Sequence, residues 1–141
     1  MQKRLLFDGR LLQFTINRLC QQLIENHGDF ANSVLMGLQP RGIFLAERIR
    51  TSLESLLNKK ILLGYLDTTF HRDDFRRRDG RPEKVELLTL IDRMYSRDIP
   101  VEATYVGRRV NTVRSQRILV ELKEQGMPED NIWIMEKEDE A

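Results

Sequence analysis

The stretch SVLMGLQPRGIFLAERIRTSLESLLNKKILLGYLD, residues 33–67, decides the fold class of this chain. It begins with a short apolar run at 33–38 and ends with another at 61–67. Between them, apolar residues recur at a spacing of about 3.6, as on one face of a helix. This order predicts a strand, a helix and a second strand, the βαβ unit of α/β proteins. Because both apolar runs are continuous, we expect a parallel sheet that is covered on both faces.

The turn Gln39-Pro40-Arg41-Gly42 lies beyond the carboxyl end of the first of these strands, where such sheets hold their ligands. Gly42 lets the backbone approach a ligand closely, Arg41 offers a forked set of donors, and the start of the helix favours anions. These features are typical of a phosphate site. A tight turn with a solvated arginine is the alternative that the local sequence leaves open.

The remaining apolar pattern predicts a further helix and several strands around this unit. A strand at 3–7 precedes a helix that starts behind the N-cap Asp8 and stops near His27 and Gly28. We expect Cys20 to fill the core, and His27 to be exposed at the helix end rather than a metal ligand. Further strands are expected at 85–93, 105–107, 118–120 and 132–135.

Length and composition suit one compact domain over residues 1–141, with 40% hydrophobic residues. The 23 basic and 22 acidic residues nearly cancel, so any site for a polyanion must be local. The single cysteine excludes an internal disulfide and a cysteine-rich zinc site. No apolar run has the length of a signal peptide or a membrane span. We therefore expect a cytoplasmic protein with no membrane partner.

The basic loop at 68–80 is a second candidate site, because it also follows a strand of the predicted sheet. It carries the pair Asp73-Asp74 among several arginines. Converging carboxylates would suit Mg²⁺, whereas adjacent aspartates beside arginines form ion pairs, which is the interpretation that we favour. A mobile solvated loop is the plainer alternative. No metal site is predicted.

The α/β pattern breaks after this loop. Parallel neighbours need a crossover connection, usually a helix. Between Leu66 and Val85 there is no amphipathic stretch long enough to form one.

Five short motifs follow one another through nearly the whole chain. They are Gln39-Pro40-Arg41-Gly42-Ile43-Phe44-Leu45-Ala46, His71-Arg72-Asp73-Asp74, Leu90-Ile91-Asp92-Arg93, Ile99-Pro100 and Tyr105-Val106-Gly107. In this order they resemble the PyrR family, pyrimidine-operon attenuation proteins that double as uracil phosphoribosyltransferases. The resemblance implies a type I phosphoribosyltransferase-like α/β fold: a mainly parallel sheet flanked by helices, with a small hood over the base site.

The resemblance also implies substrate roles for segments from different parts of the chain. In the family, one turn contacts pyrophosphate, a flexible loop covers the substrate, and part of the hood recognises the pyrimidine largely through backbone groups. The matching residues here are, respectively, Arg41 and Gly42; Arg72, Asp73 and Asp74; and Tyr105, Val106 and Gly107.

One segment of the family pattern is missing from this chain. Family members carry, after the flexible loop, a strand ending in two acids and a Thr-Gly-Arg loop that opens a helix and holds the ribose 5-phosphate. Here 79–82, Asp-Gly-Arg-Pro, follows the basic loop directly. We therefore expect a strand-helix unit on the order of 30 residues to be deleted near Asp79 and Gly80. Loss of a central strand would open the sheet and expose its apolar neighbours.

The deletion removes what the transfer of ribose from phosphoribosyl pyrophosphate (PRPP) to uracil requires. If the chain is complete, we expect no catalytic residue, no retained Mg²⁺ site for PRPP and no transferase activity. Three explanations stay open: residues absent from the sequence but present in the molecule, a truncated or engineered variant, or a natural regulator without catalysis. The contiguous numbering argues against the first, and the intact flanks argue for a recent or artificial change.

The other family function is binding of leader RNA of the pyrimidine operon, with uridine nucleotides raising affinity, which attenuates transcription. Arg18 is retained, whereas two amides replace a threonine and a histidine. Surface charges on a protein of net charge +1 are the alternative. A non-catalytic nucleotide sensor that forms homodimers or higher homo-oligomers, without RNA binding, is another. The residues in the matching places are Asn17, Arg18, Gln21, Arg93 and Arg97.

Overall fold

The computed structural model describes residues 3–67, 83–94, 102–113 and 115–136. Strand β1 (Lys3–Phe7) leads into helix α1 (Gly9–His27), as the sequence predicted. The Asp8 carboxylate accepts a hydrogen bond of 2.8 Å from the Leu11 N–H and caps the helix. Gly28 ends it at a φ of 61°, a left-handed conformation that glycine adopts without strain.

The predicted βαβ unit is present and consists of β2 (Leu35–Leu38), α2 (Gly42–Leu57) and β3 (Leu63–Leu66). Strands β2 and β3 pair in parallel, with Leu35 opposite Leu63 and Leu38 opposite Leu66. This unit supplies the turn at 39–41, which lies where the sequence placed it.

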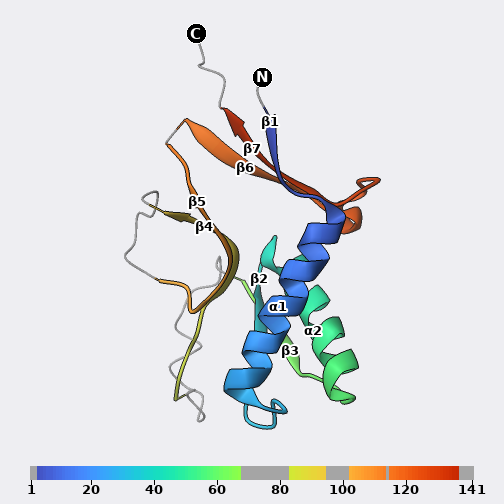
Figure 1. The fold of residues 1–141 in the computed structure, drawn as a ribbon. Coiled ribbons are helices and arrows are strands. Elements are labelled where there is room, and N and C mark those ends of the chain that lie inside the picture. Colours follow the sequence, from blue (N-terminus) through green and yellow to red (C-terminus); the bar gives the residue numbers. More distant parts are fainter. Residues whose placement is uncertain (1–2, 68–82, 95–101, 114, 137–141) are drawn as a thin grey trace.

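A second parallel ladder is formed by β4 (Leu88–Met94) and β5 (Tyr105–Asn111). The remaining strands, β6 (Gln116–Glu121) and β7 (Asn131–Glu136), flank a short 3-10 helix, η2 (Lys123–Gln125). They join β1 in an antiparallel sheet of order β1-β7-β6, here called the end sheet, at the top of Figure 1.

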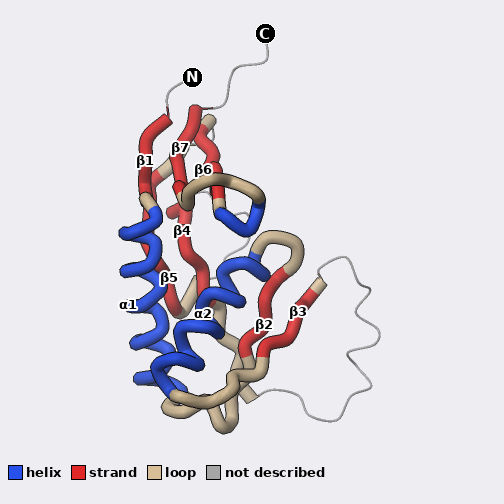
Figure 2. Tube along the Cα trace, turned by 90° about the vertical axis from the view of Figure 1, so that its right-hand side faces the viewer, coloured by secondary structure: helices blue, strands red, loops and turns tan. Residues whose placement is uncertain are grey.

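The α/β fold is confirmed, but in place of the predicted mainly parallel sheet the described strands form two parallel pairs and one antiparallel sheet. The two parallel ladders, β2-β3 and β4-β5, share no hydrogen-bonded pair of strands. In both Figure 1 and Figure 2, β2 lies between β3 and β4, and no strand among the described residues pairs with β2 on its β4 side. This arrangement agrees with the opened sheet expected after loss of a central strand.

Cover on both faces of the sheet was also expected, and it is not found for β2-β3. Helix α2 packs on one face, where Gly37 lies so close to Ala46 that a Cβ would meet the alanine methyl at 3.0 Å. On the other face Val34, Met36 and Leu62 are exposed by 53%, 51% and 69%. We call Val34, Met36, Leu38 and Leu62 the open face.

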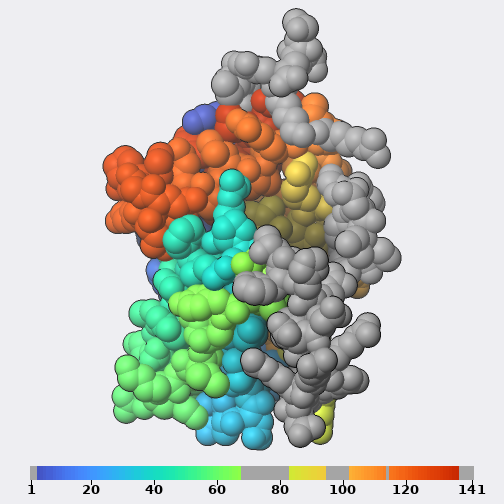
Figure 3. Space-filling view, turned by 180° about the vertical axis from the view of Figure 1, so that it is seen from behind, coloured from blue at the N-terminus to red at the C-terminus, as the bar shows by residue number. Residues whose placement is uncertain are grey.

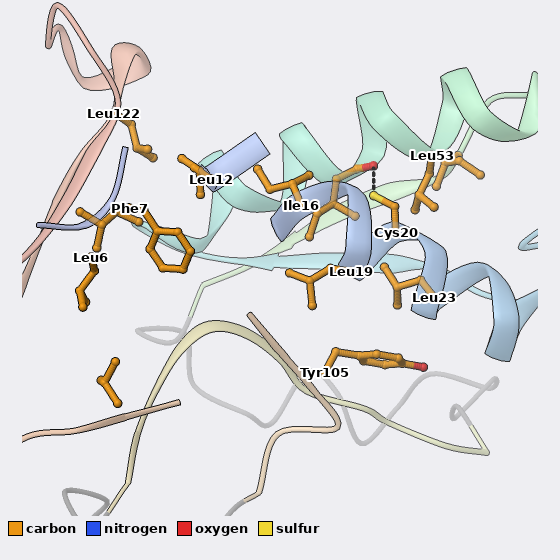
Figure 4. Packing of buried hydrophobic residues seen from close by; sticks show 14 of the residues in the cluster. Leu6, Phe7, Leu12, Ile16, Leu19, Cys20, Leu23, Leu53, Tyr105 and Leu122 are labelled. Carbon is orange, nitrogen blue, oxygen red and sulfur yellow. Dashed lines mark hydrogen bonds between the residues drawn. The ribbon is translucent and has the colours of Figure 1, made fainter. Parts of the chain in front are cut away.

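The apolar side of α1 holds these parts together. Figure 4 shows Leu19 pointing toward Tyr105 of β5, and Cys20 lying on the α2 side near Leu53. Leu19, Cys20 and Leu53 are fully buried, which confirms that Cys20 fills the core. The Cys20 thiol donates a long hydrogen bond of 3.8 Å to the Ile49 carbonyl, and burial raises its pKa to about 11. Residues of β1, β5 and β7 belong to the same buried cluster, and partly buried residues of β2 and β4 pack against it.

We predict that Leu19→Ala lowers the free energy of unfolding by about 2–5 kcal/mol, because it leaves a cavity in the buried core between α1 and β5. Urea denaturation followed by circular dichroism measures this. Leu11→Ala is the matched control: Leu11 lies on the same helix but is 43% exposed, and its loss should cost no more than about 0.5 kcal/mol. Equal losses in both variants would contradict the role of the α1 core.

Candidate functional site

The turn that carries Arg41 and Gly42 borders a cavity of about 220 Å³. Arg41 is exposed, and Gly42 begins α2. The cavity lies among α1, α2, β4 and the end of β6, and apart from a few polar groups its walls are hydrocarbon. They come from Leu12, Ile16, Arg41, Gly42, Phe44, Leu45, Arg48, Leu90, Val120, Leu122 and Gln125.

Arg48 of α2 ties this turn and cavity to the end sheet. Its guanidinium donates to both oxygens of Glu124, with Nε at 2.8 Å from Oε2, and to both oxygens of Asp130, at 2.9 and 3.0 Å. Asp130 also accepts from the Lys123 N–H at 2.9 Å. Figure 3 shows the green surface of the helix region directly below the orange surface of residues near 120–130.

The charges of this cluster reinforce one another. Hydrogen bonds from Arg48 hold the pKa of Glu124 and of Asp130 below the usual carboxyl values, although partial burial acts in the opposite direction. The hydrogen bond to Glu124 in turn raises the pKa of Arg48. The cluster therefore stays ionised at neutral pH and fixes α2 relative to the end sheet.

The pyrimidine-segment residues Tyr105, Val106 and Gly107 begin β5, in the ladder with β4 and not in the end sheet. The structure brings them together with Arg18 of α1. Its guanidinium donates to the Val106 carbonyl at 3.4 Å and also to the Gly107 carbonyl. A predicted RNA-binding side chain thus touches the backbone of the predicted pyrimidine segment. Gly107 also allows β5 to approach Thr15 of α1 closely.

The Tyr105 side chain does not face a ligand, because its ring is buried in the core. Its hydroxyl accepts from the Asn26 amide at 2.8 Å and donates to Glu86 at 3.1 Å. Burial raises the pKa of this phenol, and Glu86 raises it further. The Tyr105 side chain is therefore a structural one, held by hydrogen bonds at the end of α1.

His27 is not the exposed residue that the sequence suggested. Its Nε2 lies 2.6 Å from Oε1 of Glu86, and its Nδ1 lies 2.9 Å from the Ser33 hydroxyl. Only 25% of its side chain is exposed. Burial alone would raise the pKa of Glu86, but hydrogen bonds from His27 and Tyr105 hold it below the usual value. The cluster ties the end of α1 to the segment before β4.

Two further motif residues have structural partners. Arg93 donates to the Thr112 hydroxyl at 2.9 Å and to the Gln116 carbonyl at 2.7 Å, which joins β4 to the β5–β6 connection. Asp92 is buried and forms an ion pair of 3.7 Å with Arg109. Arg93 therefore has two hydrogen-bond partners within the chain, and its predicted role in RNA binding stays a prediction.

The remaining predicted RNA residues fall into two groups. Asn17 and Gln21 are exposed on α1, and Asn17 accepts from the Gln13 amide at 2.9 Å. Arg97 and the flexible-loop residues Arg72, Asp73 and Asp74 lie outside the described residues.

Across the parts of the chain that the structure describes, no three His, Cys, Asp or Glu side chains gather as they would around a metal ion. No helix described here is long and apolar enough to cross a membrane.

Two clusters of polar side chains, around Arg48 and around His27, were not predicted from the sequence. Arg48 and its acidic partners are far apart in the chain, and nothing in the local pattern joins them. For His27, no periodic pattern in the sequence indicates that Ser33 and Glu86, which precedes β4, are its partners. Only the position of His27 at a helix end, where it can bond residues of the following loop, could have pointed to its role.

The fold is that of type I phosphoribosyltransferases. The structure matches hypoxanthine phosphoribosyltransferase from Trypanosoma cruzi with a TM-score of 0.60 over 75% of each chain. The sequence identity is 14%, so this likeness concerns the fold alone.

Within this class, the chain belongs to the PyrR family. It is 30% identical to the bifunctional protein PyrR of Streptococcus mutans over an alignment that covers 99% of each chain. The PyrR proteins of Macrococcus caseolyticus and Bacillus subtilis are 27% and 24% identical and are covered over 94% and 92% of their lengths. No family model matches the chain.

The alignment with the Streptococcus mutans protein bears on the missing segment. It spans 176 positions, and because 141 residues cannot fill them, at least 35 positions face a gap in this chain. This agrees in size with the strand-helix unit expected to be absent.

Phosphoribosyltransferases of this fold use PRPP with Mg²⁺. Among the described acids, Asp130 and Glu124 are paired with Arg48, and Asp92 with Arg109, so these three side chains do not fit that ion. Such cation-bound carboxylates make poor Mg²⁺ ligands.

We predict that Arg48→Met destabilises the protein by about 2 kcal/mol at pH 7, because charge-assisted hydrogen bonds are lost. Arg48 lowers both carboxyl pKa values, so its contribution is present above their usual values of 4.5 and 3.8 and disappears as the pH falls below them. Thermal unfolding of both proteins between pH 3 and 7 should show the difference shrinking with acidity.

Arg4→Met serves as the control, because Arg4 is exposed on β1. A difference for Arg48→Met that stays constant down to pH 3 would contradict the ionic role of the cluster.

Proposed function

We propose that this chain is a PyrR-type regulator that binds uridine nucleotides and leader RNA of the pyrimidine operon and does not transfer ribose to uracil. The observation that carries the proposal is the break between β2 and β4, since no strand among the described residues joins the two parallel ladders.

The break between β2 and β4 argues against catalysis because ribose transfer requires a complete site on both sides of the sugar. The reaction develops positive charge on the sugar while pyrophosphate leaves, so both partners must be held in line and the charges matched. Arg41 and the start of α2 offer one half of such a site, suited to pyrophosphate oxygens. The other half, around the ribose phosphate, would come from the segment that has no counterpart here.

The hydrogen bonds from Arg18 to β5 support a coupling between nucleotide binding and RNA binding. Arg18 sits beside Asn17 on α1, and the next turn of the helix carries Gln21. Its guanidinium is held by the carbonyls of Val106 and Gly107. A pyrimidine that forms hydrogen bonds with this backbone would change the strength of the bonds that hold the Arg18 guanidinium. The position of the guanidinium, and with it the contact of Arg18 with an RNA phosphate or an unstacked base at α1, would then depend on the nucleotide.

We predict that the purified protein forms no uridine monophosphate from radiolabelled uracil and PRPP with Mg²⁺. The Streptococcus mutans relative, assayed in parallel, is the positive control. Product that depends on PRPP and grows with the amount of this protein would refute the loss of catalysis.

We predict that Arg18→Ala weakens leader-RNA binding and makes the log-log salt dependence shallower by about one. Arg18→Lys should keep the salt dependence, because it keeps the charge, but lose the response to uridine nucleotides, because one ammonium cannot bridge two carbonyls as a guanidinium does. Filter binding from low to moderate salt, with and without uridine monophosphate, measures both effects.

Arg4→Ala, at an exposed site on β1, is the control for loss of one charge. An unchanged profile for Arg18→Ala would remove α1 from the RNA surface. An unchanged nucleotide response for Arg18→Lys would remove the link through β5.

A further inference from the structure

The solvent side of α1 carries an aromatic ring that the core does not use. Phe14 is 55% exposed, although Thr15 and Ile16, which follow it on the helix, are buried. The guanidinium carbon of Arg10, one helical turn earlier, lies over the ring at 5.5 Å from its centre. A cation therefore occupies one face of the ring, while more than half of the side chain stays exposed to solvent.

The neighbours of this ring on the helix surface are charged or polar. Residues three, four and seven positions apart lie on the same side of a helix. Around the ring these positions hold Arg10, Asn17, Arg18 and Gln21, and all four are exposed. Residues 9–24 include no Asp or Glu, although 22 of the 141 residues of the chain are acidic. This side of α1 is therefore positively charged and complements a polyanion.

The combination of a ring, arginines and amides suits an unpaired nucleotide. A base of single-stranded RNA stacks its flat face on an aromatic side chain, arginines contact the phosphates beside it, and amides bond the edges of the base. An apolar protein partner would require a wider apolar surface than this helix offers. On α1, which the structure describes in full, Leu11 and Phe14 are the only large apolar side chains that are exposed.

We propose that Phe14 is a stacking site for one unpaired base of bound RNA. Arg10 lies on the opposite face of the ring and stabilises the ring by a cation–π contact, and Arg18 contacts the phosphates of the same strand. Stacking at Phe14 presupposes the RNA binding proposed above. It adds a contact of a different kind, because the residues predicted to bind RNA from the sequence include no aromatic side chain.

The test compares Phe14→Ala with the unaltered protein in filter binding of leader RNA. The variant should bind about 5- to 150-fold more weakly, which is the range for loss of one base–aromatic stack. The factor should be the same from low to moderate salt, because stacking releases no counterions. This separates Phe14 from Arg18, whose loss makes the salt dependence shallower.

Three further variants show that a flat ring is required. Phe14→Trp should keep the affinity, because it keeps an aromatic face. Phe14→Leu should bind as weakly as Phe14→Ala, because it is apolar but has no such face. Leu11→Ala is the matched control: Leu11 is another exposed apolar residue of α1, and its loss should leave the affinity unchanged. Circular dichroism verifies the fold of each variant.

Abasic nucleotides, placed one at a time in the unpaired segments of the RNA, identify the base. One of them should weaken binding of the unaltered protein by the same factor as Phe14→Ala. The same abasic RNA should bind Phe14→Ala no more weakly than the intact RNA does, since both changes remove one interaction. A fully paired RNA duplex has no base to offer and should bind both proteins equally.

The possible failures are distinguishable. RNA binding by the unaltered protein that Phe14→Ala does not weaken would overturn the stacking site alone and leave the proposed function standing. No RNA binding by the unaltered protein at low salt would overturn both. A smaller oligomer in Phe14→Ala, measured by analytical ultracentrifugation, would assign the ring to an interface between copies of the chain and would also overturn the stacking site.

Discussion

The structure depends on one packing constraint, the contact of the apolar side of α1 with strand β5 and with helix α2, which itself packs on the β2-β3 ladder. Adjacent parallel strands normally hold one another through backbone hydrogen bonds, but among the described strands β2-β3 and β4-β5 share none. Side chains such as Leu19 and Cys20, buried between α2 and β5, replace that link. Dispersion and apolar burial are less directional than hydrogen bonds, so this link fixes the two ladders less strictly than a shared strand would.

The sequence was a good guide wherever the cause of structure is local. Asp8, Gly28 and the run at 33–67 each act within a few residues, and the elements they predict are present. The pairing of the strands that follow residue 82 could not be predicted from local signals, because it depends on which other strands are present in the sheet. The chain pattern showed that a crossover was lacking, and the structure shows what that does to the order of hydrogen bonds.

In the candidate site, too, features with a local cause were predicted and features with a long-range cause were not. Arg41 and Gly42 were recognisable from the turn itself, and the structure adds an apolar cavity beside them. The partners of Arg18 and Arg48 were not recognisable, because each joins a helix to residues more than 75 positions away. Long-range polar contacts leave no periodic trace in a sequence. They matter here because Arg18 brings the predicted RNA-binding residues of α1 into contact with the predicted pyrimidine segment of β5. They matter also because Arg48 holds α2, the helix that begins at the turn, in position.

The end sheet has a consequence for the order in which the molecule can form. Strand β1 pairs with β7, with Lys3 opposite Met135, so β1 leaves the ribosome long before the strand with which it pairs. The β2-α2-β3 unit depends on closer neighbours and can form during synthesis, whereas the pairing of β1 is of high contact order and slow. Until β7 arrives, β1 is an unpaired strand with Leu6 and Phe7 exposed, and a nascent chain in this state is the one most in need of a chaperone.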